Sequence, residues 1–147
     1  MKISTKTRYG IRALLELAIY YGKKSLNIKS IAKSQSLPEK YLEHVLAYLK
    51  TAGLVKSVRG AKGGYTLALP PSEIRLNKVF QVLEGSLSPV ECVDNASYCK
   101  RSVYCATKDI WGLISRSINQ ILYSVTLQDL VQRQLGKEKY KPNFYNI

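Results

Sequence analysis

Residues 54–69 hold two short alternating runs around a glycine-rich turn, and this feature restricts the fold more than any other. Leu54–Val58 precede the turn, Arg59–Gly64 form it, and Tyr65–Leu69 follow it. Glycine permits a sharp turn and close backbone approach, while Arg59 and Lys62 offer positive charge to a phosphate surface. A hairpin of this kind directly after a helical pair is typical of the wing in a winged helix-turn-helix. It predicts double-stranded DNA as the partner.

The positive charge is concentrated in the first part of the chain. Residues 1–80 carry fifteen Lys and Arg against four Asp and Glu, a net +11, whereas residues 81–147 carry eight against six, a net +2. This asymmetry is typical of a nucleic-acid-binding domain joined to a separate module. The alternatives are a basic surface that only aids solubility and one that binds an anionic membrane. The chain opens with no secretory signal and has no apolar run near the roughly 20 residues of a spanning helix, so we expect a cytoplasmic protein without membrane contact.

Two helices are predicted before the element that would read DNA. Ser4 or Thr5 can cap the first, which is expected to run to about Tyr21. Its apolar face consists of Tyr9, Ala13, Leu14, Leu17, Ala18 and Tyr21. Arg8 and Arg12 lie off this face, one turn apart, where they could reach the DNA backbone. Asn27 is the expected cap of a short second helix, and a turn over residues 34–37 follows it.

The next helix, from Pro38 to about Ala52, is the predicted recognition helix. Its expected buried stripe consists of Tyr41, Leu42, Val45, Leu46 and Leu49. In a helix-turn-helix the second helix enters the major groove, which makes Lys40, Glu43 and His44 candidates for base contacts. Glu43 would be repelled by phosphates unless it accepts a hydrogen bond from cytosine; otherwise it caps the helix or pairs with Lys40. Lys40 and the single histidine, His44, could equally be plain surface residues.

Beyond the wing, the sequence predicts a short helix over residues 76–83, an irregular loop over 86–105 and a long helix over 107–125. The apolar stripe of the long helix comprises Ile110, Ile114, Ile118, Ile121 and Val125, with Ser117 as an alternative to Ile118. Little chain remains to cover it, so we expect a homodimer, with packing on the first helix as the alternative. Thr126-Leu127-Gln128-Asp129 resembles a capping box for a last helix that ends near Gly136. Residues 137–147 are expected to form a flexible tail.

All three cysteines lie in the irregular loop, with the spacing C-x6-C-x5-C at Cys92, Cys99 and Cys105. An odd number of cysteines in a cytoplasmic chain argues against a disulfide framework. Thiolates clustered in one loop favour a soft metal centre, either zinc or an iron–sulfur cluster, although zinc sites usually have closer pairs. Thiol redox sensing and incidental cysteines are the other interpretations. The sequence contains no recognisable acid–base pair or nucleophile constellation, so no enzyme is expected.

Three stretches resemble IscR/CymR-type bacterial transcription regulators over about residues 1–130. They are the opening Met1–Tyr9, the run Tyr41–Glu43, and Gly53–Gly60 together with Gly63-Gly64-Tyr65. The cysteine trio resembles the IscR branch, whose members bind a [2Fe–2S] cluster and control iron–sulfur biogenesis genes. This resemblance implies that the three cysteines ligate the cluster. It also implies that Arg59 and Gly60 lie at the minor groove and that Glu43 sets specificity.

The chain departs from the IscR branch at the fourth ligand. That branch commonly has a histidine three residues after its last cysteine, and here the position is Lys108, whose ammonium has no lone pair to donate. Asp109, Asp94, Glu43, a residue of the other subunit or solvent could take its place. The CymR branch represses cysteine metabolism together with a cysteine synthase. The tail ends in Ile147, like peptides that such synthases capture, but CymR would not require the three cysteines.

The sequence therefore predicts a mainly α fold with a small β-wing and a long C-terminal dimerisation helix. The expected divisions are a DNA-binding domain over 1–85, a cluster loop over 86–105, dimerisation and terminal helices over 106–136, and a tail over 137–147. The predicted function is a homodimeric repressor of a palindromic promoter, modulated by a [2Fe–2S] cluster. The alternative is a repressor of cysteine metabolism regulated by its thiols or by a cysteine synthase.

Overall fold

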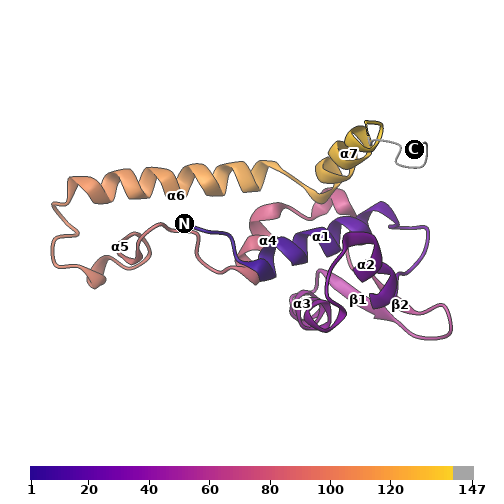
Figure 1. Cartoon of the computed structure of the whole chain (residues 1–147). Helices are drawn as coiled ribbons and strands as arrows, with labels where there is room; N and C mark the ends of the chain where they lie inside the picture. Colours follow the sequence, from indigo (N-terminus) through magenta and orange to yellow (C-terminus); the bar gives the residue numbers. More distant parts are fainter. Residues whose placement is uncertain (141–147) are drawn as a thin grey trace, which may run out of the picture.

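The computed structural model describes residues 1–140 and confirms a mainly helical fold with one small antiparallel sheet (Figure 1). In chain order the elements are α1 (Thr5–Ile19), α2 (Ile28–Gln35), α3 (Glu39–Thr51), β1 (Val55–Val58), β2 (Gly64–Leu67), η1 (Pro71–Glu73), α4 (Leu76–Leu83), α5 (Glu91–Asp94), η2 (Ala96–Tyr98), α6 (Ala106–Ser124) and α7 (Leu127–Glu138). We call α1–α4, the wing and α7 the head, and residues 86–124 the arm. None of the described helices combines the length and the apolar composition that crossing a bilayer requires.

The helices of the head begin at the polar caps that the sequence indicates. The Ser4 side chain accepts from the Thr7 amide, and Asn27 accepts from the Ser30 amide at 2.8 Å. α1 ends at Ile19, two residues earlier than predicted, because the chain turns away at Tyr20–Gly22, and Tyr21 is consequently exposed. Tyr41, predicted in the buried stripe of α3, is also exposed at its edge, where its ring meets Tyr9 edge-on at 5.4 Å.

The core of the head lies between α1, α3 and α4. Its fully buried side chains include Leu14, Leu17, Leu42, Leu46, Leu49 and Val79. α7 follows α6 in the sequence but packs in space against α1, where Leu127 is fully buried. Thr126 and Asp129 form the predicted capping box at its start, and the helix continues past Gly136 to Glu138.

The wing is the hairpin of β1 and β2, paired from Val55↔Leu67 to Val58↔Gly64. A third segment joins it, since Leu26 and Tyr65 exchange backbone hydrogen bonds of 2.9 and 2.7 Å. A Cβ at Gly64 would overlap the carbonyl of Leu26, so this approach requires glycine. The wing is thereby attached to the segment that leads into α2.

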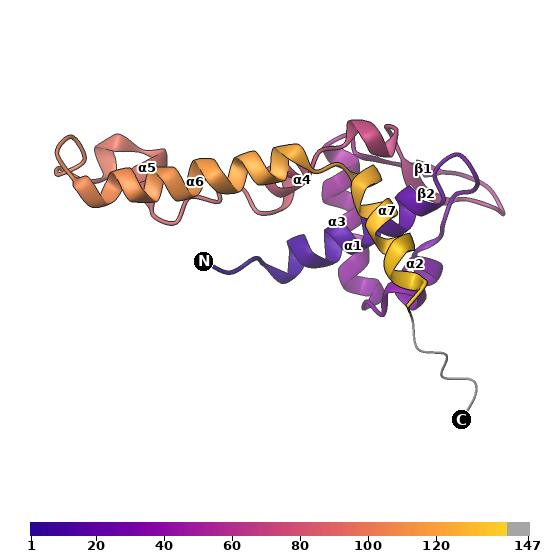
Figure 2. The same ribbon diagram turned by 90° about the horizontal axis from the view of Figure 1, so that it is seen from above.

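The arm extends away from the head (Figures 1 and 2), with α5 lying beside α6. Arg75 ties the end of α6 to the head, donating to the Tyr123 carbonyl at 2.8 Å while its guanidinium lies 4.5 Å from the Tyr123 ring centre. The predicted stripe of α6 is largely uncovered within the described chain, with Ile110, Ile114 and Ile121 all exposed.

Candidate DNA-binding surface and cysteine loop

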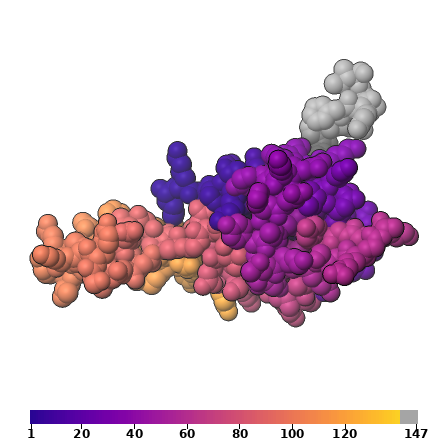
Figure 3. Space-filling view, turned by 90° about the horizontal axis from the view of Figure 1, so that it is seen from below, coloured from indigo at the N-terminus to yellow at the C-terminus, as the bar shows by residue number. Residues whose placement is uncertain are grey.

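The exposed face of α3 carries the predicted base-contact residues. Lys40, Glu43 and His44 are all exposed near the start of the helix, while Leu42, Val45 and Leu46 anchor its opposite face. Figure 3 views the molecule from the side of α3, with the wing at one end and the arm at the other. The three predicted contact residues are therefore brought together on one accessible surface.

The tip of the wing presents Arg59, Gly60 and Lys62, and all three are exposed. Ser25 donates its hydroxyl to the Lys62 carbonyl at 2.7 Å, which fixes the tip against the loop before α2. The hairpin is held at its backbone, and the side chains of Arg59 and Lys62 are exposed at its tip. It therefore has the shape and the charge needed to follow a nucleic-acid groove.

The start of α1 adds a third set of cations, in which the two arginines differ. Arg8 is exposed and donates only to Thr5, one turn earlier on the same helix, at 3.1 Å. Arg12, by contrast, donates to the side chain and the backbone carbonyl of Gln35, so it links α1 to the end of α2. The prediction of a phosphate contact therefore fits the geometry of Arg8 better than that of Arg12.

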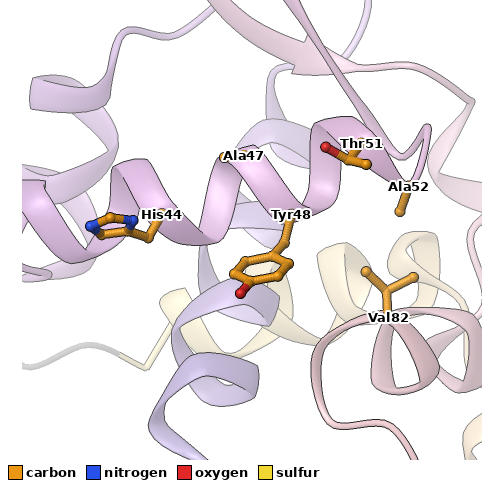
Figure 4. A pocket seen from close by; sticks show the side chains of 6 residues that line it. All are labelled: His44, Ala47, Tyr48, Thr51, Ala52 and Val82. Atoms are coloured by element: carbon orange, nitrogen blue, oxygen red, sulfur yellow. The ribbon is translucent and has the colours of Figure 1, made fainter.

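A hollow of about 520 Å³ lies beside this surface (Figure 4). His44, Ala47, Tyr48 and Thr51 of α3 line it together with Ala52 and with Val82 of α4. The Tyr48 ring also receives the ammonium of Lys6, 4.6 Å from its centre. Sequence reasoning missed Lys6 and Tyr48, because neither lies on a predicted apolar stripe. Their contact becomes visible only when α1 is packed on α3.

The three cysteines lie at different points of the arm and are all free and partly exposed. Cys92 lies in α5, Cys99 follows η2, and Cys105 directly precedes α6. Cys99 and Cys105 line one hollow of about 480 Å³ together with Arg101 and Tyr104. The Thr107 hydroxyl and the backbone amide of Lys108 lower the pKa of Cys105.

As a donor set, three thiols fit a soft metal or an iron–sulfur cluster. Within residues 1–140, however, no three Cys, His, Asp or Glu side chains are grouped closely enough to hold a metal ion. Lys108, at the position of the expected fourth ligand, donates to the buried Ser102 hydroxyl. The donors are thus present in one loop, and bringing them onto one centre requires the loop to rearrange.

The first residues of the arm are fixed by a polar network. Asp94 accepts hydrogen bonds from Ser86 and from Ser88, the latter at 2.6 Å, and both lower its pKa. Ser88 also lies 3.1 Å, oxygen to oxygen, from Ser115, which is buried on α6. The loop is thereby attached to α6 close to Cys92.

Known proteins are similar to this chain in both sequence and fold. HTH-type transcriptional regulator CymR of Bacillus subtilis is 41% identical over 139 residues, which is 95% of this chain and 96% of that protein. HTH-type transcriptional regulator IscR of Vibrio atlanticus is 33% identical over 132 residues, covering 90% and 76%.

Solved structures of CymR and IscR proteins are similar to this chain in fold. The structure of CymR, the global cysteine regulator of B. subtilis, superimposes with a TM-score of 0.78 over 90% of this chain and 98% of that one. T. potens IscR superimposes with a TM-score of 0.77 at 39% identity, over 99% and 95%.

The family model named Rrf2, an iron-dependent transcriptional regulator, matches residues 3–133. The predicted resemblance to IscR/CymR-type regulators is confirmed, and the homologues are transcriptional regulators rather than enzymes. This chain belongs to the Rrf2 family of transcriptional regulators.

Proposed function

We propose that the chain is a homodimeric, cytoplasmic repressor whose affinity for a palindromic promoter site is modulated by a [2Fe–2S] cluster. Its targets would be iron–sulfur biogenesis genes. The observation that carries the proposal is the position of the cysteines: all three of the chain lie in the segment that joins the DNA-binding head to α6. A change in this segment is well placed to alter how two heads are held.

The DNA contacts follow from the exposed surface of the head. Lys40, Glu43 and His44 would face base edges in the major groove, while Arg59, Gly60 and Lys62 would follow the adjacent minor groove. Arg8 would contact a backbone phosphate. Such contacts carry a large electrostatic component, so affinity should fall steeply with salt.

The dimer follows from α6. Its 19 residues extend about 28 Å at 1.5 Å per residue. Ile110 and Ile121 are 51% and 63% exposed along it. Covering this stripe with the same helix of a second copy would remove it from water and place two heads on successive turns of DNA.

Cys92, Cys99 and Cys105 would hold the cluster, which supplies a centre whose loading and charge depend on iron and redox conditions. Lys108 cannot complete the ligand set as an ammonium, so a fourth donor would come from Asp94, Asp109, the partner subunit or solvent. Closing the loop around such a centre would rearrange residues 86–105 and shift the balance between head positions.

Anaerobic purification tests the proposal. We expect a coloured protein with stoichiometric iron and sulfide, and a promoter affinity that changes when the cluster is removed. Cys99→Ala should abolish the colour, whereas Val103→Ala, a change at a 96% exposed position of the same loop, should retain it. A colourless protein that still binds its promoter would contradict the cluster but not the DNA-binding role.

A second function rests on the shared hollow of Cys99 and Cys105. The chain would then be a repressor of cysteine metabolism that responds through its thiols or through a cysteine synthase. The identity to CymR supports this alternative. From residue 141 onward, the tail that would bind the synthase lies outside the residues that the structure describes. Metal-free protein whose DNA affinity changes on thiol oxidation, or on adding the synthase, would favour this function; bound zinc would favour neither.

A further inference from the structure

Glu84, the residue directly after α4, makes an unusual set of contacts with the start of α1. Its carboxylate accepts from the Ser4 amide at 3.2 Å to each oxygen and from the Ser4 hydroxyl at 2.7 Å. It also accepts from the hydroxyl of Thr7, which is fully buried. The Glu84 side chain thus bonds both the cap and the first turn of α1, although it lies 80 and 77 residues further along the chain.

Glu84 also lies at the boundary between head and arm. Gly85, with a φ of +81°, turns the chain directly after it. Ser86 bonds Asp94 within the cysteine loop and so begins the network that attaches this loop to α6 through Ser88 and Ser115. Only one residue separates the carboxylate that holds α1 from the hydroxyl that holds the loop. A displacement of the loop therefore reaches the backbone of Glu84 through a very short segment.

The start of α1 in turn contacts the recognition helix. Lys6 lies over the ring of Tyr48, and Tyr9 meets Tyr41 edge-on. α1 and α4 also pack so closely that a Cβ at Gly10 would overlap the Leu83 side chain. These contacts leave α1 little freedom to move independently of either α4 or α3.

We propose that Glu84 is the positioning residue that couples the cysteine loop to the DNA-reading surface. When the loop moves the end of α4, Glu84 draws the start of α1 with it, and α1 carries Arg8 and the contacts to α3. The coupling is strong because the Thr7 hydroxyl is buried. If α1 did not follow, this hydroxyl would lose the carboxylate that accepts its hydrogen, without access to water, and would keep only its contact with the Ser4 hydroxyl at 3.2 Å. The inference rests on the proposed function for its effect on DNA, but not for the coupling itself.

The test compares two states of the loop in the wild type and in Glu84→Gln. The first comparison is cluster-loaded against cluster-free protein under anaerobic conditions. The second is protein alkylated with N-ethylmaleimide against unmodified protein, and it does not require a cluster. Alkylation addresses this loop alone, because the chain contains only three cysteines and all lie within it. Glu73→Gln, a change at an exposed acid of η1, provides the control with the same change in charge.

The DNA is one duplex that the wild-type protein selects from a random-sequence pool. For each variant, the readout is the affinity for this duplex in one loop state divided by the affinity in the other state. Allosteric coupling commonly amounts to about 5- to 150-fold, and we expect a ratio in this range for the wild type and Glu73→Gln. In Glu84→Gln the ratio should approach unity. If Glu84 were merely structural, both states would lose affinity in parallel and the ratio would persist, which would overturn the proposal.

Hydrogen exchange provides a readout that is independent of DNA. Alkylation should change the exchange of the amides at the start of α1 in the wild type and leave it unchanged in Glu84→Gln. No response of α1 in the alkylated wild type would refute the coupling whatever the cluster does. A response of α1 without DNA binding or without a cluster would instead refute the proposed function and retain the role of Glu84.

Thr7→Val tests the same contact by removing the hydroxyl that donates to Glu84. Without the hydroxyl the link is weakened, so this variant should also reduce the ratio, and adding it to Glu84→Gln should cause no further change. A further independent reduction in the double variant would show that Thr7 acts by another route and would count against the proposal.

Discussion

The head and the arm are built on different principles. In the head, apolar side chains of α1, α3 and α4 close on one another, and Leu14, Leu46 and Leu49 are wholly removed from water. In the arm, Ile110, Leu113, Ile114 and Ile121 are exposed, and the start of the loop is held by hydrogen bonds among Ser86, Ser88, Asp94 and Ser115. A closed core resists change, whereas a segment held by such contacts can be remodelled at small cost. Under the proposed function, the head would recognise DNA and the arm would respond to the signal.

The largest expected effect concerns the arm. Ile114→Glu combined with Ile121→Glu should prevent dimerisation, because it would place charges in the proposed apolar contact. Sedimentation should then report a monomer, and promoter binding should be lost while the head remains folded by circular dichroism. Gln120→Glu adds one charge to an exposed position of the same helix and should leave the dimer intact. A double variant that stays dimeric would place the dimer contact elsewhere.

The next effect concerns the head. Leu46 is fully buried, so Leu46→Ala should destabilise the protein by about 2–5 kcal/mol in urea unfolding. Leu135→Ala, the same change at a 47% exposed position of α7, should stay within about 0.5 kcal/mol of the wild type. Equal losses at the two positions would argue against the closed core described above.

The wing should give a smaller effect that is confined to binding. Arg59→Ala should weaken promoter affinity by about 1–3 kcal/mol per contact and lower its salt dependence, without changing the unfolding free energy. Lys139→Ala also removes one cation, from the exposed C-cap of α7, and should change affinity less. Figure 1 shows α7 on the side of the head opposite α3. Equal effects of the two substitutions would indicate that net charge, rather than the wing, governs binding.

The smallest effect is the pH dependence of the boundary between the two regions. Hydrogen bonds from the Ser4 and Thr7 hydroxyls lower the pKa of Glu84 below its ordinary value of 4.5. The ionised carboxylate therefore stabilises the fold above that value, and its contribution is lost as the pH falls through the lowered pKa. Acid titration of stability should be steeper in the wild type than in Glu84→Gln. Identical titrations would show that the contact contributes nothing to folding.

Much of the head could be predicted because its signals are local. Ser4 and Asn27 cap helices, Gly53 ends α3 with a φ of 78°, and the wing follows from alternating residues around glycines. Tyr21 and Tyr41 are predicted to be buried but are exposed. Tyr21 lies beyond the end of α1, and Tyr41 lies at the solvent edge of the apolar stripe of α3. Periodicity assigns a face, but it does not determine how far the neighbouring elements cover that face.

The sequence by itself determined the class of the fold, the basic surface and the gathering of all cysteines in one loop, because these depend on neighbours along the chain. Only the tertiary structure decided that α7 returns to α1, that Arg12 binds α2, and that Glu84 holds Ser4 and Thr7. These contacts join residues far apart in the chain. They arise from how closely whole helices pack, so no local pattern of residue types encodes them.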